Sequence, residues 1–86
     1  MNSSLEAPLQ NRCRIDIVAE ILEATLNGSS KTRIMNRAQL NFASLNKYLA
    51  LLLDLKLLEI AENTERMVFK TTDSGLRFLE SYQEIR

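Results

Sequence analysis

The spacing of apolar residues along the chain predicts helices over its first two thirds. From Arg12 to Leu26, apolar residues recur every three or four positions, which is the repeat of a helix with one buried side. Asn11 is a suitable N-cap for this helix, and Asn27 with Gly28 ends it, because glycine readily adopts the left-handed conformation found after helices. The apolar stripe is wide enough to be covered from two sides; it consists of Ile15, Ile17, Val18, Ile21, Leu22 and Leu26.

Two further helices follow, and small polar residues mark where each begins. Ser29 or Ser30 is the expected N-cap of a helix from Lys31 to Ala38. Asn41 is the expected N-cap of the next helix, which runs from Phe42 to Leu55. The short connection between these helices predicts that they pack against each other.

The helix from Phe42 to Leu55 has two opposite lines of residues with different character. The predicted buried line is Leu45, Leu49 and Leu52, with Phe42 and Tyr48 beside it. We expect this line to pack against Ile15, Val18, Leu22 and Ile34. The opposite line is small, polar and basic, so it would fit a groove that bulky side chains would not enter; it consists of Ala43, Lys47, Ala50 and Asp54, flanked by Ser44 and Asn46.

After Leu55 the pattern changes to two short strands. Apolar residues within 57–61 and 67–69 predict a β-hairpin whose turn is the polar stretch 63–66. Thr72 can cap a last helix from Asp73 to Ile85. The expected fold is therefore mainly α with a small β-hairpin. Residues 1–10 are predicted to be a loose tail, residues 11–71 the domain, and residues 72–86 a C-terminal helical element.

The last helix has more apolar residues than one packing face requires. Such residues occupy over half of its circumference, and a domain of 86 residues has only a thin core, so association would stabilise it. We therefore expect a homodimer; the predicted contact residues are Phe78, Leu79, Tyr82 and Ile85.

Charge is balanced over the whole chain but not along it. There are 11 basic and 11 acidic residues, yet no acidic residue lies between Glu23 and Asp54. That interval holds four basic residues, so the surface of the second and third helices suits a phosphate-lined groove. The basic residues are Lys31, Arg33, Arg37 and Lys47. The hairpin region, in contrast, carries Glu59, Glu62 and Glu65.

The groups that enzymes and metal sites need are scarce. The chain has no histidine, one cysteine and two glycines, which argues against acid–base catalysis, a metal centre or a glycine-rich phosphate loop. We expect no enzyme activity and no cofactor or small-molecule ligand. Cys13 is interpreted as a small packed residue, and the carboxylates of Asp16, Glu20 and Glu23 as a solvated face. With no apolar run long enough to span a membrane and no signal-peptide pattern, a cytoplasmic protein is expected.

The order of three helices, a hairpin and a last helix is that of a winged helix-turn-helix domain. The stretch from Lys31 to Leu49 resembles the small archaeal winged-helix DNA-binding proteins, several of which dimerise through a C-terminal coiled-coil helix. Arg14–Ala24 and Thr72-Asp73-Ser74-Gly75 also resemble that family, and the likeness extends from about Arg12 to Glu80. Lys56 stands where the family usually has glycine after the third helix, and a left-handed conformation there would cost about 1–2 kcal/mol.

The resemblance implies that the third helix enters the major groove of DNA and that the hairpin, the wing, approaches phosphates. By position it implies phosphate contacts for Lys31, Arg33 and Arg37. It places Ser44, Asn46 and Lys47 near base edges and makes Arg66 the wing residue. The complete implied DNA-binding set is Lys31, Arg33, Arg37, Asn41, Ser44, Asn46, Lys47 and Arg66.

The expected function is double-stranded DNA binding, as a transcriptional regulator or a nucleoid protein. The alternative is a docking module for other proteins, because winged helices serve both purposes and a fold does not fix a function. The basic second and third helices favour DNA. The zero net charge and the acidic wing favour docking.

Overall fold

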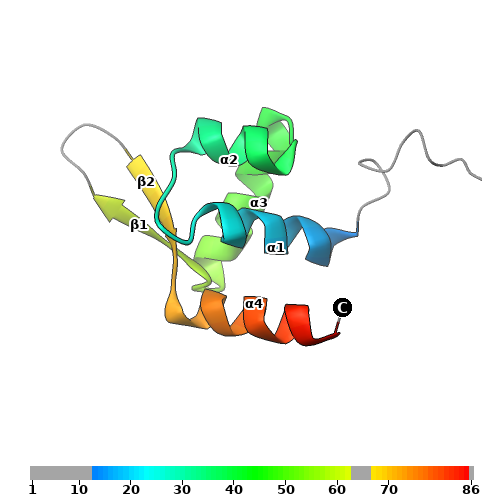
Figure 1. Ribbon diagram of the computed structural model, residues 1–86. Coiled ribbons are helices and arrows are strands. Elements are labelled where there is room, and N and C mark those ends of the chain that lie inside the picture. Colours follow the sequence, from blue (N-terminus) through cyan, green and yellow to red (C-terminus); the bar gives the residue numbers. More distant parts are fainter. Residues whose placement is uncertain (1–12, 63–66, 86) are drawn as a thin grey trace, which may run out of the picture.

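The computed structural model describes residues 13–62 and 67–85 (Figure 1). It confirms the predicted class, with four helices and one antiparallel hairpin. The predicted tail at residues 1–10, the Asn11 cap and Arg66 lie outside the described residues. The elements are α1 (Arg14–Ala24), α2 (Lys31–Ala38), α3 (Phe42–Asp54), β1 (Leu58–Glu62), β2 (Met67–Thr71) and α4 (Asp73–Ile85).

Helix α1 lies at the centre of the molecule. It packs against α2 on one side and α4 on the other, and the hairpin projects beside them (Figure 1). This position explains its wide apolar stripe. The three leucines predicted for the buried line of α3 are all buried, as are Val18, Leu22 and Ile34. The complete buried apolar core is Ile17, Val18, Ala19, Ile21, Leu22, Ile34, Ala38, Leu45, Leu49, Leu52, Leu58, Phe69, Leu79 and Tyr82.

Three of the predicted N-caps are confirmed by their hydrogen bonds. The Ser30 hydroxyl accepts from the Arg33 amide at 3.4 Å, and the Asn41 side-chain oxygen accepts from the Ser44 amide at 2.8 Å. The Thr72 hydroxyl accepts from the Gly75 amide at 3.1 Å. Each bond satisfies an amide that the first turn of a helix leaves without a backbone partner.

The left-handed residues lie at the ends of helices. Gly28 has φ of 93° after α1, as the sequence predicts. Lys56 has φ of 64° after α3, so it does adopt the left-handed conformation, which costs about 1–2 kcal/mol in a residue with a side chain. A hydrogen bond of 2.7 Å from the Thr72 hydroxyl to the Lys56 carbonyl holds this turn against the start of α4.

The base of the hairpin is joined to the end of α1. Ser29 and Phe69 exchange two backbone hydrogen bonds of 2.8 and 2.9 Å beside the β1–β2 pair. Thr71 is buried, and its hydroxyl donates to the Leu22 carbonyl at 2.7 Å. It also lies 2.8 Å from the Thr25 hydroxyl. The polar residue at the end of β2 is therefore satisfied by α1 and fixes the hairpin on the helices.

Some residues predicted to be buried are exposed. Ile15, in the first turn of α1, is 42% exposed. Leu26 is 39% exposed and lies in the turn after α1, because the helix ends at Ala24 rather than at the predicted Leu26. The prediction that Ile15 packs in the core is therefore wrong. Phe42, the first residue of α3, is 59% exposed. Cys13 is also exposed and precedes α1 without forming a side-chain cap, so its assignment as a packed residue is wrong.

Helix α4 buries two of the residues predicted for the dimer contact. Leu79 and Tyr82 face the core of their own chain, because α4 packs along α1, and Phe78 is half-buried. The Tyr82 hydroxyl donates to Asp16, so this carboxylate is a structural partner rather than part of a purely solvated face. The prediction that Leu79 and Tyr82 need a second chain to cover them is therefore wrong. Ile85 lies in the last turn of α4.

Candidate nucleic-acid interface

The outer face of α3 is a shallow polar surface. Ala43, Lys47, Ala50 and Asp54 are exposed, as the helical repeat predicts, and Ser44 and Asn46 are half-buried on its flanks. Two of the four exposed side chains are single methyl groups. This surface can therefore approach a flat or grooved partner closely, with Lys47 as its longest polar group.

The beginnings of α2 and α3 are joined by an aromatic contact. The Lys31 ammonium lies over the Phe42 ring, 5.2 Å from its centroid, a geometry in which the ring attracts the cation. This contact gives the exposed Phe42 a role that the hydrophobic pattern does not predict. It also holds Lys31 beside the first turn of α3. The side-chain oxygen of Asn41 is occupied by the helix cap, which leaves its amide nitrogen for another partner.

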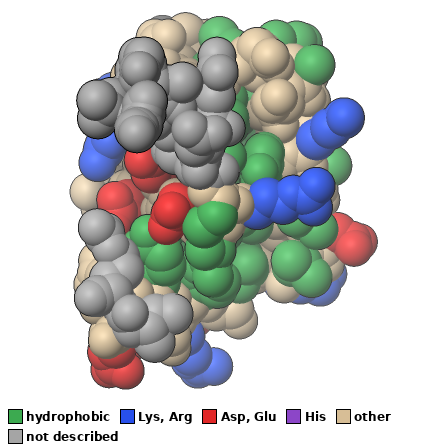
Figure 2. Space-filling view, turned by 90° about the vertical axis from the view of Figure 1, so that its right-hand side faces the viewer, with side chains coloured by type: hydrophobic (Ala, Val, Ile, Leu, Met, Phe, Trp, Pro, Cys, Tyr) green, Lys and Arg blue, Asp and Glu red, His purple; other side chains and the backbone are tan. Residues whose placement is uncertain are grey.

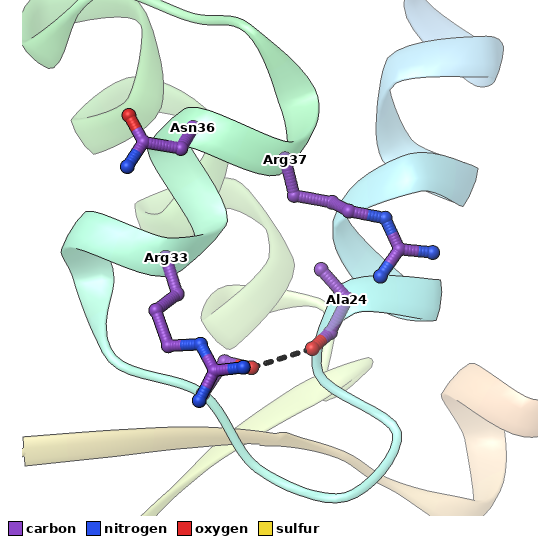
Figure 3. Close-up of a pocket in the computed structure, with 5 residues that line it drawn as sticks. Ala24, Arg33, Asn36 and Arg37 are labelled. Atoms are coloured by element: carbon purple, nitrogen blue, oxygen red, sulfur yellow. Dashed lines mark hydrogen bonds between the residues drawn. The ribbon is translucent and has the colours of Figure 1, made fainter.

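Arg33 and Arg37 lie on a different side of α2 from Lys31. Two residues of helix separate Lys31 from Arg33, a rotation of about 200°. Figure 3 shows both guanidinium groups directed toward α1 and the turn after it, where they line a hollow of about 360 Å³ with Ala24, Ser29 and Asn36. The three basic residues of α2 therefore form two groups rather than one continuous surface.

Lys47 is part of a second hollow, on the flank of α3. It shares a space of about 220 Å³ with Arg14, Tyr48 and Leu51. Leu51 is 47% exposed. Figure 2 shows hydrophobic side chains gathered on one face of the molecule with basic side chains at their margin. The sequence gives no sign that Arg14 belongs with Lys47, because 33 positions separate them and only the packing of α1 and α3 brings them together.

The described part of the wing has mixed charge. Glu59 is exposed on β1, and it is paired in register with the exposed Lys70 of β2. Lys70 is not among the residues that the sequence predicts for the wing, which are the acidic Glu59, Glu62 and Glu65 and the basic Arg66. The predicted wing contact, Arg66, lies outside the described residues.

Residues 13–62 and 67–85 contain no group of three or more His, Cys, Asp or Glu side chains suited to a metal ion. Among these residues, no helix has the length and apolar character needed to cross a membrane.

Similar structures are found among DNA-binding proteins. The chain superposes on Sso10a-2, a DNA-binding protein from Sulfolobus solfataricus, with a TM-score of 0.78 and 24% identity, covering 86% of this chain and 78% of that one. It also superposes on MepR, a transcription regulator of the Staphylococcus aureus multidrug efflux pump MepA, with a TM-score of 0.69 and 18% identity. That match covers 83% of this chain but only 53% of MepR. At these identities the likeness shows the fold.

A third similar structure is ZitR, a zinc-responsive MarR family member from Lactococcus lactis. The TM-score is 0.62 at 19% identity, over 87% of this chain and 61% of ZitR. No curated protein sequence matches the chain. The sequence model of the winged helix-turn-helix family, however, matches residues 11–86. Since that match spans nearly the whole chain and the structure has the same order of elements, the protein belongs to the winged helix-turn-helix family.

Proposed function

We propose that the protein binds double-stranded DNA, with α3 in the major groove. The observation that carries this proposal is the outer face of α3, where the exposed Ala43, Lys47 and Ala50 form a small, basic surface with no acidic residue before Asp54. The major groove of B-DNA is wide enough to admit an α-helix, whose outward polar side chains can then contact base edges.

Within this proposal, α2 and α3 have different roles. Lys31, held beside the first turn of α3 by its contact with Phe42, would neutralise a phosphate at the edge of the groove. Ser44, Asn46 and Lys47 would lie near base edges, where amide and ammonium groups distinguish base pairs. Arg33 and Arg37 face away from Lys31, so they would reach only phosphates that flank this groove.

We further propose a regulatory or architectural role on DNA rather than catalysis. Two of the similar solved structures are named as a DNA-binding protein and as a transcription regulator, which supports this reading. The absence of histidine from the chain and its single, exposed cysteine agree with a protein that binds rather than transforms its partner.

Substitution of the outer face of α3 should change sequence preference. Lys47→Gln and Asn46→Ala are each expected to alter the difference in binding free energy between two duplexes by roughly 1–3 kcal/mol, the value of a bidentate base contact. Fluorescence anisotropy with mixed duplexes at two salt concentrations would measure this. Arg77→Gln, an exposed cation on α4, is the control and should leave the preference unchanged. Undetectable duplex affinity at about 50 mM salt, where phosphate contacts are strong, would contradict DNA binding.

A docking function remains the second candidate because of the apolar flank of α3. Leu51 and Leu55 are 47% and 54% exposed and lie one turn apart. Exposed apolar residues that adjoin one another are typical of surfaces that bind proteins. If the duplex experiment fails while Leu51→Glu abolishes binding to a protein partner, the docking function is the correct one.

We also propose that the protein forms a homodimer through the outward side of α4. Leu79 and Tyr82 are buried, so the contact would use the exposed Leu76 and the adjacent Leu26, which share one surface hollow. Leu76→Asp is expected to give a folded monomer, because Leu76 is 41% exposed and contributes little to the core. Leu79→Asp should instead unfold the chain. Sedimentation of the unmodified protein at micromolar concentration tests the proposal, and a monomer there would contradict it.

A further inference from the structure

The hollow between α2 and the turn after α1 has the features of an anion site. Arg33 and Arg37, one helical turn apart, extend their guanidinium groups to either side of the hydrogen bond between Ser29 and Ala24 (Figure 3). No acidic side chain of the described residues lines the hollow. Two guanidinium groups therefore share one small space without a carboxylate to neutralise them.

Within residues 13–62 and 67–85, neither guanidinium is taken up by an ion pair or a side-chain hydrogen bond. The guanidinium N–H groups of Arg33 and Arg37 can therefore donate hydrogen bonds to a ligand. Both arginines are exposed, so a ligand can reach them from solvent. A guanidinium presents parallel N–H groups that match the oxygens of a phosphate, and such charge-assisted pairs are stronger than neutral hydrogen bonds.

The floor of the hollow is fixed before any ligand binds. The Ser29 hydroxyl donates to the Ala24 carbonyl at 2.6 Å, which satisfies an acceptor at the end of α1 that would otherwise face an anion. The backbone of Ser29 is held in turn by its two hydrogen bonds to Phe69. Because α2 is joined to this turn at the Ser30 cap, the two arginines project from a rigid support.

We propose that this hollow, lined by Ala24, Ser29, Arg33, Asn36 and Arg37, is a discrete phosphate-binding site. The site extends the phosphate contacts proposed above for Arg33 and Arg37, and it does not require the outer face of α3 to bind DNA. The lining offers two cations and the Asn36 amide but only one apolar residue, Ala24, so it recognises the phosphate rather than the group that carries it. The volume of about 360 Å³ admits a phosphomonoester as well as a phosphate of a nucleic-acid backbone. Which of these two kinds of molecule supplies the phosphate group is decided by the experiment below.

The test is a titration of the full chain with inorganic phosphate, followed by the NMR shifts of the amides of Ser29, Arg33 and Asn36. Sodium chloride keeps the ionic strength near about 0.1 M, so that general screening stays constant. We expect saturable shifts confined to the hollow. Arg33→Gln with Arg37→Gln should weaken binding about tenfold or more, because the charge-assisted hydrogen bonds are lost.

The matched control removes two exposed cations elsewhere, Lys70→Gln with Arg77→Gln, and should leave the phosphate affinity unchanged. Shifts that do not saturate, or that persist in the Arg33/Arg37 variant, would overturn the proposal. Thermal melting of each variant shows that it remains folded, which is expected because all four side chains are exposed.

Two further titrations identify the carrier. If adenosine monophosphate shifts the same amides and a short duplex does not displace it, the hollow takes a free phosphomonoester. If the duplex displaces phosphate from the hollow, its ligand is a backbone phosphate. Lys47→Gln separates this proposal from the proposed function, because it should impair duplex recognition by α3 while leaving the affinity for inorganic phosphate intact.

Discussion

Replacing Leu49 with alanine is expected to lower the free energy of unfolding by about 2–5 kcal/mol, the usual result of truncating a buried leucine. Leu49 is only 3% exposed and belongs to the core that α1, α2 and α3 share. The cavity lies where three helices meet, so no single side chain can move to fill it. In a small domain this loss is a large part of the total stability, and urea denaturation would measure it.

Leu51→Ala is the matched control, because it makes the same truncation two residues along the same helix. Leu51 is 47% exposed, so its loss of unfolding free energy should be under about 1 kcal/mol. Equal losses in the two variants would mean that the inward and outward sides of α3 are assigned incorrectly.

Replacing Gly75 with alanine should destabilise the protein, although the same change in an exposed helix usually stabilises it by about 1 kcal/mol. A β-carbon at Gly75 would lie 2.5 Å from the Leu57 carbonyl oxygen and 2.5 Å from a methyl group of Thr71. The first neighbour is backbone, and the second belongs to the buried hydroxyl pair with Thr25, so neither moves easily. We expect a loss of roughly 1–3 kcal/mol or more, as for other overpacked positions.

Ser74→Ala provides the comparison for Gly75→Ala, since Ser74 is exposed in the same turn of α4. Its effect on the thermal midpoint should be small. A rise in the midpoint on Gly75→Ala would show that α4 can shift away from the hairpin and that this contact is not close in solution. The four-residue motif Thr72-Asp73-Ser74-Gly75 thus has two physical functions, a cap at its first residue and a close approach at its last.

The sequence predicts the order of the elements and most of their boundaries, because helix periodicity and cap residues are local signals. The buried line of α3 follows from spacing, and the caps at Ser30, Asn41 and Thr72 follow from the small polar residues at the helix starts. The sequence does not predict which apolar residues at the ends of a helix are buried, because their burial depends on where the neighbouring helices end. Ile15 and Leu26 belong to the predicted stripe of α1 but are exposed.

The candidate sites depend even more on the arrangement in space. Lys31 and Arg33 are two positions apart, and the sequence groups them with Arg37 as one basic surface. The structure directs Lys31 toward Phe42, whereas Arg33 joins Arg37 beside Ser29. The helical repeat of 100° per residue already places Lys31 and Arg33 on different sides of α2. The sequence does not show, however, that one side of α2 faces α3 and the other faces the turn after α1.

The backbone contact between Ser29 and Phe69 covers part of one edge of the small sheet. Phe69 of β2 is bonded to Ser29 on the side away from β1, whereas no such bridge is present on the outer side of β1 among the described residues. An open edge is a place where proteins pair with one another and aggregate, and charged side chains discourage such pairing. Glu59, exposed on β1, places a carboxylate on that strand. This exposed carboxylate is therefore expected to discourage self-association of the sheet.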